Sequence, residues 1–236
     1  MRIRKNRRAT VASALVTILF VSIASRFMSD RAESRAVAEE PKTAKATDAD
    51  KKWISLFDGK TLDGWKITDF GGQGQVSVEE GKLNIEIGQP MSGVTYKKEF
   101  PKVDYEIHLE AMRVEGTDFF CGLTFPVKDS HCSFIVGGWA GSVVGISSID
   151  GHDASENDTT QVMKFKNNKW YKIRVRVRAD KLEAWIDDQQ MVDQNIKGRR
   201  ISTRAEVDPS KPLGLSTYLT HAAIRDFKYR LLDEKE

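Results

Sequence analysis

The densest group of side chains that could do chemistry lies at residues 149–160, where the sequence is I-D-G-H-D-A-S-E-N-D-T-T. Carboxylates and an imidazole in one loop can hold a divalent cation, or supply the acid and base that act on a sugar. A loop that serves only as a connection has the same polar composition, and the spacing does not match an EF-hand. Both interpretations stay open. For the functional one, we predict catalytic roles for Asp150, His152, Asp153 and Glu156, and a divalent metal cation of unknown identity at Asp150, Asp153 and Asp158.

A tryptophan flanked by small residues, in the sequence G-G-W-A-G-S at 137–142, is the second feature. Small neighbours leave the face of an indole ring open, and sugar rings stack on such faces through their apolar C–H groups. The alternative is a tryptophan that covers the end of the core while the glycines make the bends. We predict that Trp139 binds a carbohydrate ligand or substrate together with Tyr218 and His221, on the same rim as the 149–160 loop.

The two cysteines, Cys121 and Cys132, lie on the apolar faces of two consecutive predicted strands. If these strands form a hairpin, the two sulfurs are roughly opposite each other. Two cysteines in an exported protein favour a disulfide, so we predict a cross-strand bridge. Two reduced, buried cysteines that pack as small apolar side chains are the alternative.

Alternation of apolar and polar residues indicates the elements that must position these side chains. It is clear at 105–111, 173–177, 182–186 and 227–231, and one apolar residue out of phase predicts a β-bulge near Arg225 and Asp226. Basic residues at 172, 174, 176 and 178 fall on the polar face of one such strand. No apolar pattern has a long helical period. The sequence therefore predicts an all-β fold, a two-sheet antiparallel sandwich.

The N-terminus has the features of an export signal. Five basic residues precede an uncharged apolar run at 9–24, which as a helix would be about 24 Å long and short for a membrane span. We predict a cleaved signal peptide at 1–24, with an N-terminal membrane anchor as the alternative, and a periplasmic, cell-envelope or extracellular location. Residues 25–52 lack an apolar period and are predicted to be a disordered linker, followed by one domain at 53–236.

The charge of the chain gives no indication of nucleic-acid binding. The formal net charge is +3, but residues 1–24 hold five basic and no acidic residues, so the remainder carries −2. No serine-nucleophile motif, phosphate-binding glycine loop or cysteine-rich zinc pattern is present in the sequence.

Three segments resemble one known family. They are W-I-S-L-F-D-G-K-T-L-D-G-W-K at 53–66, N-K-W-Y-K-I-R-V-R-V at 168–177 and K-P-L-G-L at 211–215. Their sequences are similar to those of bacterial 3-keto-disaccharide hydrolases, and the resemblance extends over 53–231. It implies a jelly roll like that of concanavalin A and laminin G domains. It also implies cleavage of 3-keto-glycosides, in which the C3 ketone acidifies the C2 proton, a base starts elimination, and hydration completes net hydrolysis.

Two short segments depart from this family's pattern. Phe119-Phe120-Cys121-Gly122 stands where many members have Asn-Ser-Gly, and Ser216-Thr217-Tyr218 stands where many have Gln-Asp-His. We therefore keep three functional classes: a hydrolase or lyase acting on 3-keto-glycosides, a non-catalytic lectin-like module that binds a glycan, and an envelope-tethered interaction domain. Sandwich folds host all three, so the fold alone does not choose among them.

Overall fold

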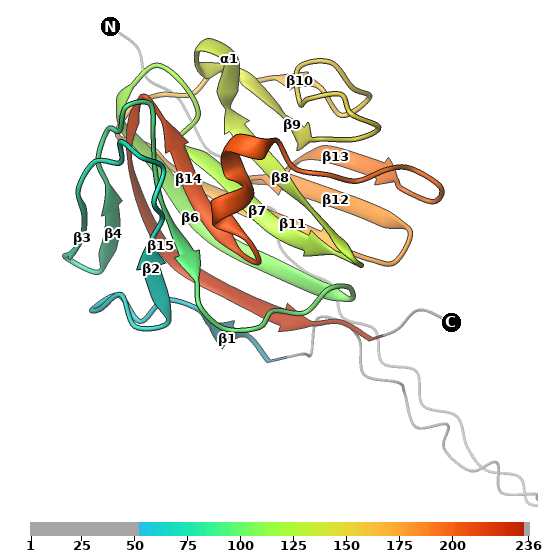
Figure 1. The fold of residues 1–236 in the computed structure, drawn as a ribbon, viewed down its shortest axis with the longest axis horizontal. Helices are drawn as coiled ribbons and strands as arrows, with labels where there is room; N and C mark the ends of the chain where they lie inside the picture. Colours follow the sequence, from blue (N-terminus) through green and yellow to red (C-terminus); the bar gives the residue numbers. More distant parts are fainter. Residues whose placement is uncertain (1–51, 234–236) are drawn as a thin grey trace, which may run out of the picture. The chain divides into compact units, whose positions relative to one another are not determined.

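The computed structural model describes residues 52–233, and these form two antiparallel sheets packed face to face (Figure 1). The predicted all-β sandwich is confirmed. The predicted signal peptide, the anchor alternative and all of the predicted linker except residue 52 lie outside the described residues. Within 52–233, no helix is both long enough and apolar enough to cross a membrane.

The first sheet, which we call sheet A, contains eight strands. In spatial order they are β13 (Gln189–Asn195), β12 (Lys181–Ile186), β11 (Trp170–Val177), β6 (Tyr105–Gly116), β15 (Thr220–Leu231), β4 (Lys82–Ile85) and β3 (Val76–Glu79), with β1 (Ile54–Ser55) also paired to β15. The longest strands, β6 and β15, run side by side in the middle of this order.

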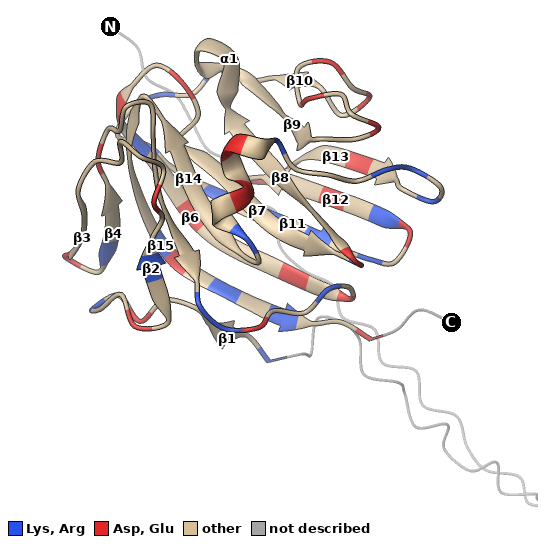
Figure 2. Cartoon of the chain, viewed as in Figure 1, with Lys and Arg blue, Asp and Glu red and all other residues tan. Residues whose placement is uncertain are grey.

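The second sheet, sheet B, contains seven strands. In spatial order they are β10 (Gln161–Val162), β9 (Val143–Ser147), β8 (Ser130–Gly137), β7 (Cys121–Val127), β14 (Gly214–Tyr218), β5 (Met91–Tyr96) and β2 (Trp65–Ile67). A turn labelled α1 (Gly138–Gly141) joins β8 to β9, and a 3₁₀ helix, η2 (Ala205–Ser210), precedes β14. The strands β7, β8, β9 and β14 contain no Lys, Arg, Asp or Glu (Figure 2).

Alternating side chains from both sheets form the core. On β6, Ile107 and Leu109 are fully buried, and on β8, Phe134 and Val136 are as well. Successive residues of a strand point to opposite faces, so this pattern orients every strand. Burying one such side chain stabilises the fold by about 1.5–3 kcal/mol. The predicted bulge is confirmed: the pairing of β15 with β6 shifts between Arg225 and Lys228.

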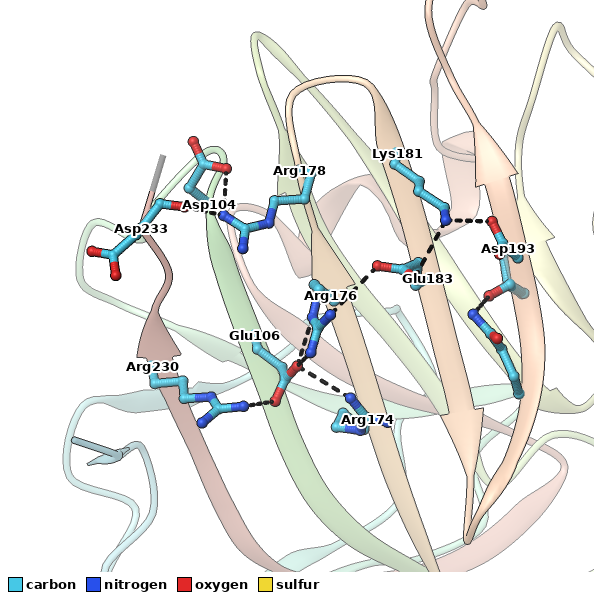
Figure 3. Close-up of polar contacts among 12 residues, drawn as sticks. Asp104, Glu106, Arg174, Arg176, Arg178, Lys181, Glu183, Asp193, Arg230 and Asp233 are labelled. Atoms are coloured by element: carbon cyan, nitrogen blue, oxygen red, sulfur yellow. Dashed lines mark hydrogen bonds and ion pairs between the residues drawn. The ribbon is translucent and has the colours of Figure 1, made fainter. Parts of the chain in front are cut away.

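The outer face of sheet A carries an ion-pair network around one buried carboxylate. Glu106 is 1% exposed, and its oxygens lie 3.3 Å from Arg174, 2.9 Å from Arg176 and 2.8 Å from Arg230. Figure 3 shows these three arginines pointing toward Glu106 from the strands on both sides of β6. The Arg174 guanidinium also lies 3.6 Å from the centroid of the Trp185 ring. The basic side chains predicted for the polar face of β11 therefore have a structural role, because Arg174 and Arg176 are already paired with Glu106.

The predicted disulfide is wrong in this structure, because both cysteines are free and buried. The hairpin of β7 and β8 turns between Val127 and Ser130, which pairs Cys121 with Val136 and Cys132 with Phe125. The two cysteines share the core-facing side, but they are four residues out of register along the strands. That offset corresponds to about 13 Å, far beyond the Cα separation that a disulfide spans.

Candidate functional site

A groove of about 720 Å³ lies on the face of sheet B that points away from sheet A. Its lining includes Ser133 and Ile135 of β8, which alternate with the core residues Phe134 and Val136 and so point outward. At one end of the strands the groove is bordered by Phe119, Tyr218 and Trp139. The segment 204–209, which includes η2, also lines it.

Several outward-facing residues of the central strands of sheet B are small. The hydroxyls of Thr124 and Ser133 hydrogen-bond across β7 and β8 at 2.8 Å. A Cβ added to Gly122 would lie 2.8 Å from the Ser216 Oγ and 3.0 Å from the Phe119 ring. Only glycine fits at residue 122, and this lets the Phe119 ring lie over the strand.

Trp139 is held in an unusual backbone conformation. Within α1, Trp139 and Ala140 have φ of 48° and 64°, in the left-handed region, so this turn is not a regular helix. Consecutive residues with side chains seldom adopt that region, and such strain is concentrated at functional sites. Trp139 is 39% exposed and lines the groove. Its role in binding stays a prediction.

Asp118 connects the Trp139 turn to the start of β7. One carboxylate oxygen accepts the backbone N–H of Phe119 at 2.8 Å, and the other accepts that of Ala140 at 3.0 Å. The backbone N–H of Asp118 itself donates to the Thr220 hydroxyl at 3.1 Å. No cation lies within 4 Å of this carboxylate among residues 52–233, and each of its oxygens can accept a further hydrogen bond.

Arg204 brings a cation to the groove and is fixed by two carboxylates. Its guanidinium lies 2.5 Å from Asp153 and 2.9 Å from Glu206. The hydrogen bond from Arg204 holds the pKa of Glu206 below its usual value, and the pKa of Arg204 is raised in turn. The other Asp153 oxygen accepts the hydroxyls of Ser147 and Ser148 at 3.1 and 3.0 Å. Asp153 therefore orients Arg204 from outside the groove lining.

The rest of the 149–160 loop lies away from the groove. Asp150 and Asp158 both pair with Arg199, at 2.5 and 3.2 Å, while His152 and Glu156 are exposed. Asn157 orders the loop by donating to three backbone carbonyls, those of residues 146, 152 and 153. Of the four predicted catalytic residues, only Asp153 contacts residues that line the groove.

The predicted cation ligands do not converge on one point. Asp150 and Asp158 face Arg199, while Asp153 faces Arg204, so arginine already supplies the positive charge that a divalent ion would bring. These residues do not fit a metal ion.

The one described group of three metal-type ligands within 4.8 Å is His108, Glu110 and Asp226, on sheet A. Both carboxylates are paired there, Glu110 with Arg225 at 2.7 Å and Asp226 with Lys228 at 2.8 Å. Like Glu106, this group lies on the face of β6 that points away from the core.

Tyr218 and His221, the other two predicted ligand-binding residues, separate in the structure. Tyr218 lines the groove, with its ring centroid 5.9 Å from that of Phe119. His221 is on β15 opposite Glu115 and is not among the lining residues.

Sequence reasoning missed Asp118, Arg204 and Glu206. Asp118 directly precedes one of the two segments that depart from the family pattern, which was a usable signal, whereas Arg204 lies in an irregular segment with none.

Comparison with known proteins identifies one family and several solved structures with a similar fold. The profile of a family described as a 3-keto-alpha-glucoside-1,2-lyase-like domain matches residues 52–230. No curated protein matches the chain. A solved structure described as a native glycosidic hydrolase has 10% identity and a TM-score of 0.53, with 79% of this chain and 98% of that chain covered. The Crh5 transglycosylase has 13% identity and a TM-score of 0.51, covering 81% and 87%.

A carbohydrate-binding module from Bacillus subtilis, CBM66, has 12% identity and a TM-score of 0.49, covering 76% of this chain and 99% of the module. At the identities of the hydrolase and the transglycosylase, the likeness establishes the sandwich fold and nothing further.

Proposed function

Because this chain belongs to the family of 3-keto-alpha-glucoside-1,2-lyase-like domains, we propose that it cleaves 3-keto-glycosides in the groove of sheet B. The observation that supports this most is that an exposed tryptophan, an unpaired carboxylate and a guanidinium line one groove. These groups are Trp139, Asp118 and Arg204.

The chemistry needs a base and an oxyanion partner. The base removes the proton from C2, and the electron pair forms an enolate with its charge on the C3 oxygen. The enolate then expels the aglycone from C1, which leaves as an alcohol after taking up a proton, and a C1=C2 double bond remains. Addition of water across that bond gives the 3-keto-sugar. The sum is one glycoside and one water converted to one 3-keto-sugar and one alcohol.

Each group has one role in this scheme. Trp139 stacks against the sugar ring. Asp118 is the base, because it adjoins Trp139 and has no cation partner among the described residues. Arg204 stabilises the charge on the C3 oxygen, since a fixed guanidinium needs no reorientation during the reaction. Asp153 and Glu206 hold Arg204 in place.

A glycan-binding module is the second candidate, and one observation favours it. Both oxygens of Asp118 already accept backbone N–H groups, and Glu206 is paired with Arg204, so the groove carboxylates also make sense as structural groups. In that case Trp139 and Arg204 hold a sugar without chemistry.

Turnover of a 3-keto-glucoside in D₂O, followed by proton NMR, distinguishes the proposed cleavage from glycan binding without chemistry. Elimination and hydration place a deuterium at C2 of the released 3-keto-sugar from the first turnover. The unoxidised glucoside, which lacks the acidic C2 proton, is the control and should not react. Release of a sugar that keeps its C2 proton would contradict elimination, and saturable binding without release would favour the glycan-binding module.

Asp118→Asn tests the base, with Asp69→Asn as the matched control. Asp69 is a second groove carboxylate without a cation partner in the described part of the chain, but it follows β2, three strands away from β7, the strand that Asp118 precedes. We expect Asp118→Asn to lower kcat by about 10²–10⁴ and Asp69→Asn to have a much smaller effect. An equal loss in both variants would remove Asp118 from the role of base.

We also propose that the protein is exported, on the basis of the basic and apolar segments at 1–24. Fractionation of cells that produce the full chain, compared with a chain starting at residue 25, tests this. A signal peptide predicts a shortened protein outside the cytoplasm, and a full-length protein in the membrane fraction would identify the anchor instead.

A further inference from the structure

We propose that the groove receives an aromatic leaving group, so that its substrates are 3-keto-glycosides of phenolic alcohols. This inference rests on the proposed function and deepens it. Its basis is a row of apolar side chains that begins beside Asp118 and crosses sheet B away from Trp139. We call this row the apolar lane: Phe119, Tyr218, Met91, Pro90 and Phe70.

The order of the strands places these side chains one after another. Phe119 precedes β7, Tyr218 ends β14 and Met91 begins β5, and these three strands are neighbours. Tyr218 pairs with Met91, and its backbone N–H donates to the Phe119 carbonyl oxygen at 3.1 Å. From β7 to β5 there are two strand spacings, or about 10 Å, which is the length of one or two fused aromatic rings.

Arg204, the cation of the groove, is displaced from Trp139 along the direction of the strands, whereas the apolar lane runs across them. Val143, at the start of β9, pairs with Gly138 beside Trp139. Ser147, which contacts the carboxylate that orients Arg204, lies four residues further along the same strand. That separation is about 13 Å. A sugar between Trp139 and Arg204 therefore directs its aglycone past Asp118 and onto Phe119.

The composition of the lane favours an aromatic group over a second sugar. The Phe119 and Tyr218 side chains are partly exposed, and their rings are 5.9 Å apart and inclined by 38°, which leaves some ring surface available to a ligand. Aromatic pairs contribute about 0.5–1.5 kcal/mol beyond the area they bury. A sugar in the lane would leave the hydroxyls over its middle without partners, because Tyr218 carries the only polar side-chain group of these five residues and the carboxylates Asp118 and Asp69 adjoin only its two ends.

The structure brings the two aromatic rings of the lane to one part of the groove. Ser216 pairs with Gly122, so the segments that carry Tyr218 and Phe119 are adjacent. Both side chains line the groove. Two neighbouring rings therefore form one surface that an aromatic leaving group can cover.

The test compares kcat/KM for two 3-keto-glucosides, one with a phenyl group and one with a second glucose as the leaving group. The ratio of the two values is measured for the wild type, Phe119→Tyr and Phe119→Ser. Intrinsic leaving-group reactivity is the same for all three proteins and cancels when their ratios are compared. We expect Phe119→Tyr to keep the ratio within about twofold and Phe119→Ser to lower it about tenfold. Thermal unfolding of each variant checks that the fold is kept.

An unchanged ratio in Phe119→Ser, with both substrates turned over, would overturn the aromatic leaving group and leave the proposed function standing. If the wild type neither binds nor turns over either of the two substrates, the proposed function is overturned, and this inference with it.

Discussion

The carboxylate of Asp118 accepts the backbone N–H of Ala140 at 3.0 Å, across 22 residues of sequence. This contact fixes the strained turn that presents Trp139, and it places an acidic group next to the tryptophan. Binding surface and proposed base are therefore held by the same interaction. The turn and the carboxylate should respond together to substitutions beneath them.

Gly141→Ala should displace this turn. Gly141 has a φ of 95°, and an added Cβ would lie 2.8 Å from an Arg113 nitrogen and 2.9 Å from the Thr117 carbonyl oxygen. Gly198→Ala is the matched control, because its φ is 73° and nothing lies within 4 Å of its Cβ position. We expect both variants to lose about 1 kcal/mol from the positive φ. Only Gly141→Ala should also weaken ligand binding, by about tenfold in a calorimetric titration, and equal binding by the two variants would refute the role of the turn.

Asp153→Ala should lower turnover by releasing Arg204. Asp153 contacts Arg204 at 2.5 Å, whereas Asp158 contacts Arg199 at 3.2 Å and serves as the control. Because Arg204 is assigned to the developing charge, we expect kcat to fall by about 10–100-fold in Asp153→Ala, with a smaller change in KM. Asp158→Ala and His152→Ala should resemble the wild type. A loss of kcat in either of these would return the catalytic role to the 149–160 loop.

Glu106→Ala should destabilise the protein without a direct effect on the groove. It removes a 1%-exposed carboxylate and leaves Arg174, Arg176 and Arg230 without their shared partner. Breaking a buried ion pair costs about 3–5 kcal/mol, and the low end applies because the arginines are partly exposed. For a domain of this size, 3 kcal/mol lowers Tm by about 6–12 °C. Glu80→Ala, which removes an exposed pair with Lys82, is the control, and an equal Tm in the two variants would contradict the network's importance.

The two thiols should stay reduced and unreactive in the folded protein. Burial raises the pKa of Cys121 to about 12 and raises that of Cys132 as well, so the reactive thiolate is scarce. We expect no labelling by iodoacetamide in the native state and two labels after unfolding without reductant. Mass spectrometry of protein produced in an oxidising compartment measures this. Unfolded protein that takes up no label would restore the disulfide.

The strands were predictable because alternation is a local signal. The apolar positions of β6 and β11 could be identified residue by residue, and the bulge near Asp226 could be inferred from one change of phase. Hairpin register was not predictable, because it depends on where the turn is centred. Cys121 and Cys132 would be opposite only if the turn were two residues nearer the N-terminus than Lys128 and Asp129.

The candidate site was predicted only in part, because some of its contacts join segments far apart in the sequence. Trp139 and Tyr218 could be identified as candidate groove residues from residue type and local context. Arg204 could not, because its contact with Asp153 crosses 51 residues and lies in a segment without periodicity. The acidic composition of the 149–160 loop gave a misleading signal, since most of its carboxylates pair with arginines that the sequence does not place near them.

The crystal structure of Asp118→Asn bound to a 3-keto-glycoside tests the central claim most directly. The account predicts a sugar ring against Trp139, its C3 oxygen within hydrogen-bond distance of Arg204, and its C2 next to residue 118. A ligand bound at the 149–160 loop or on the outer face of sheet A, with the groove of sheet B empty, would contradict it.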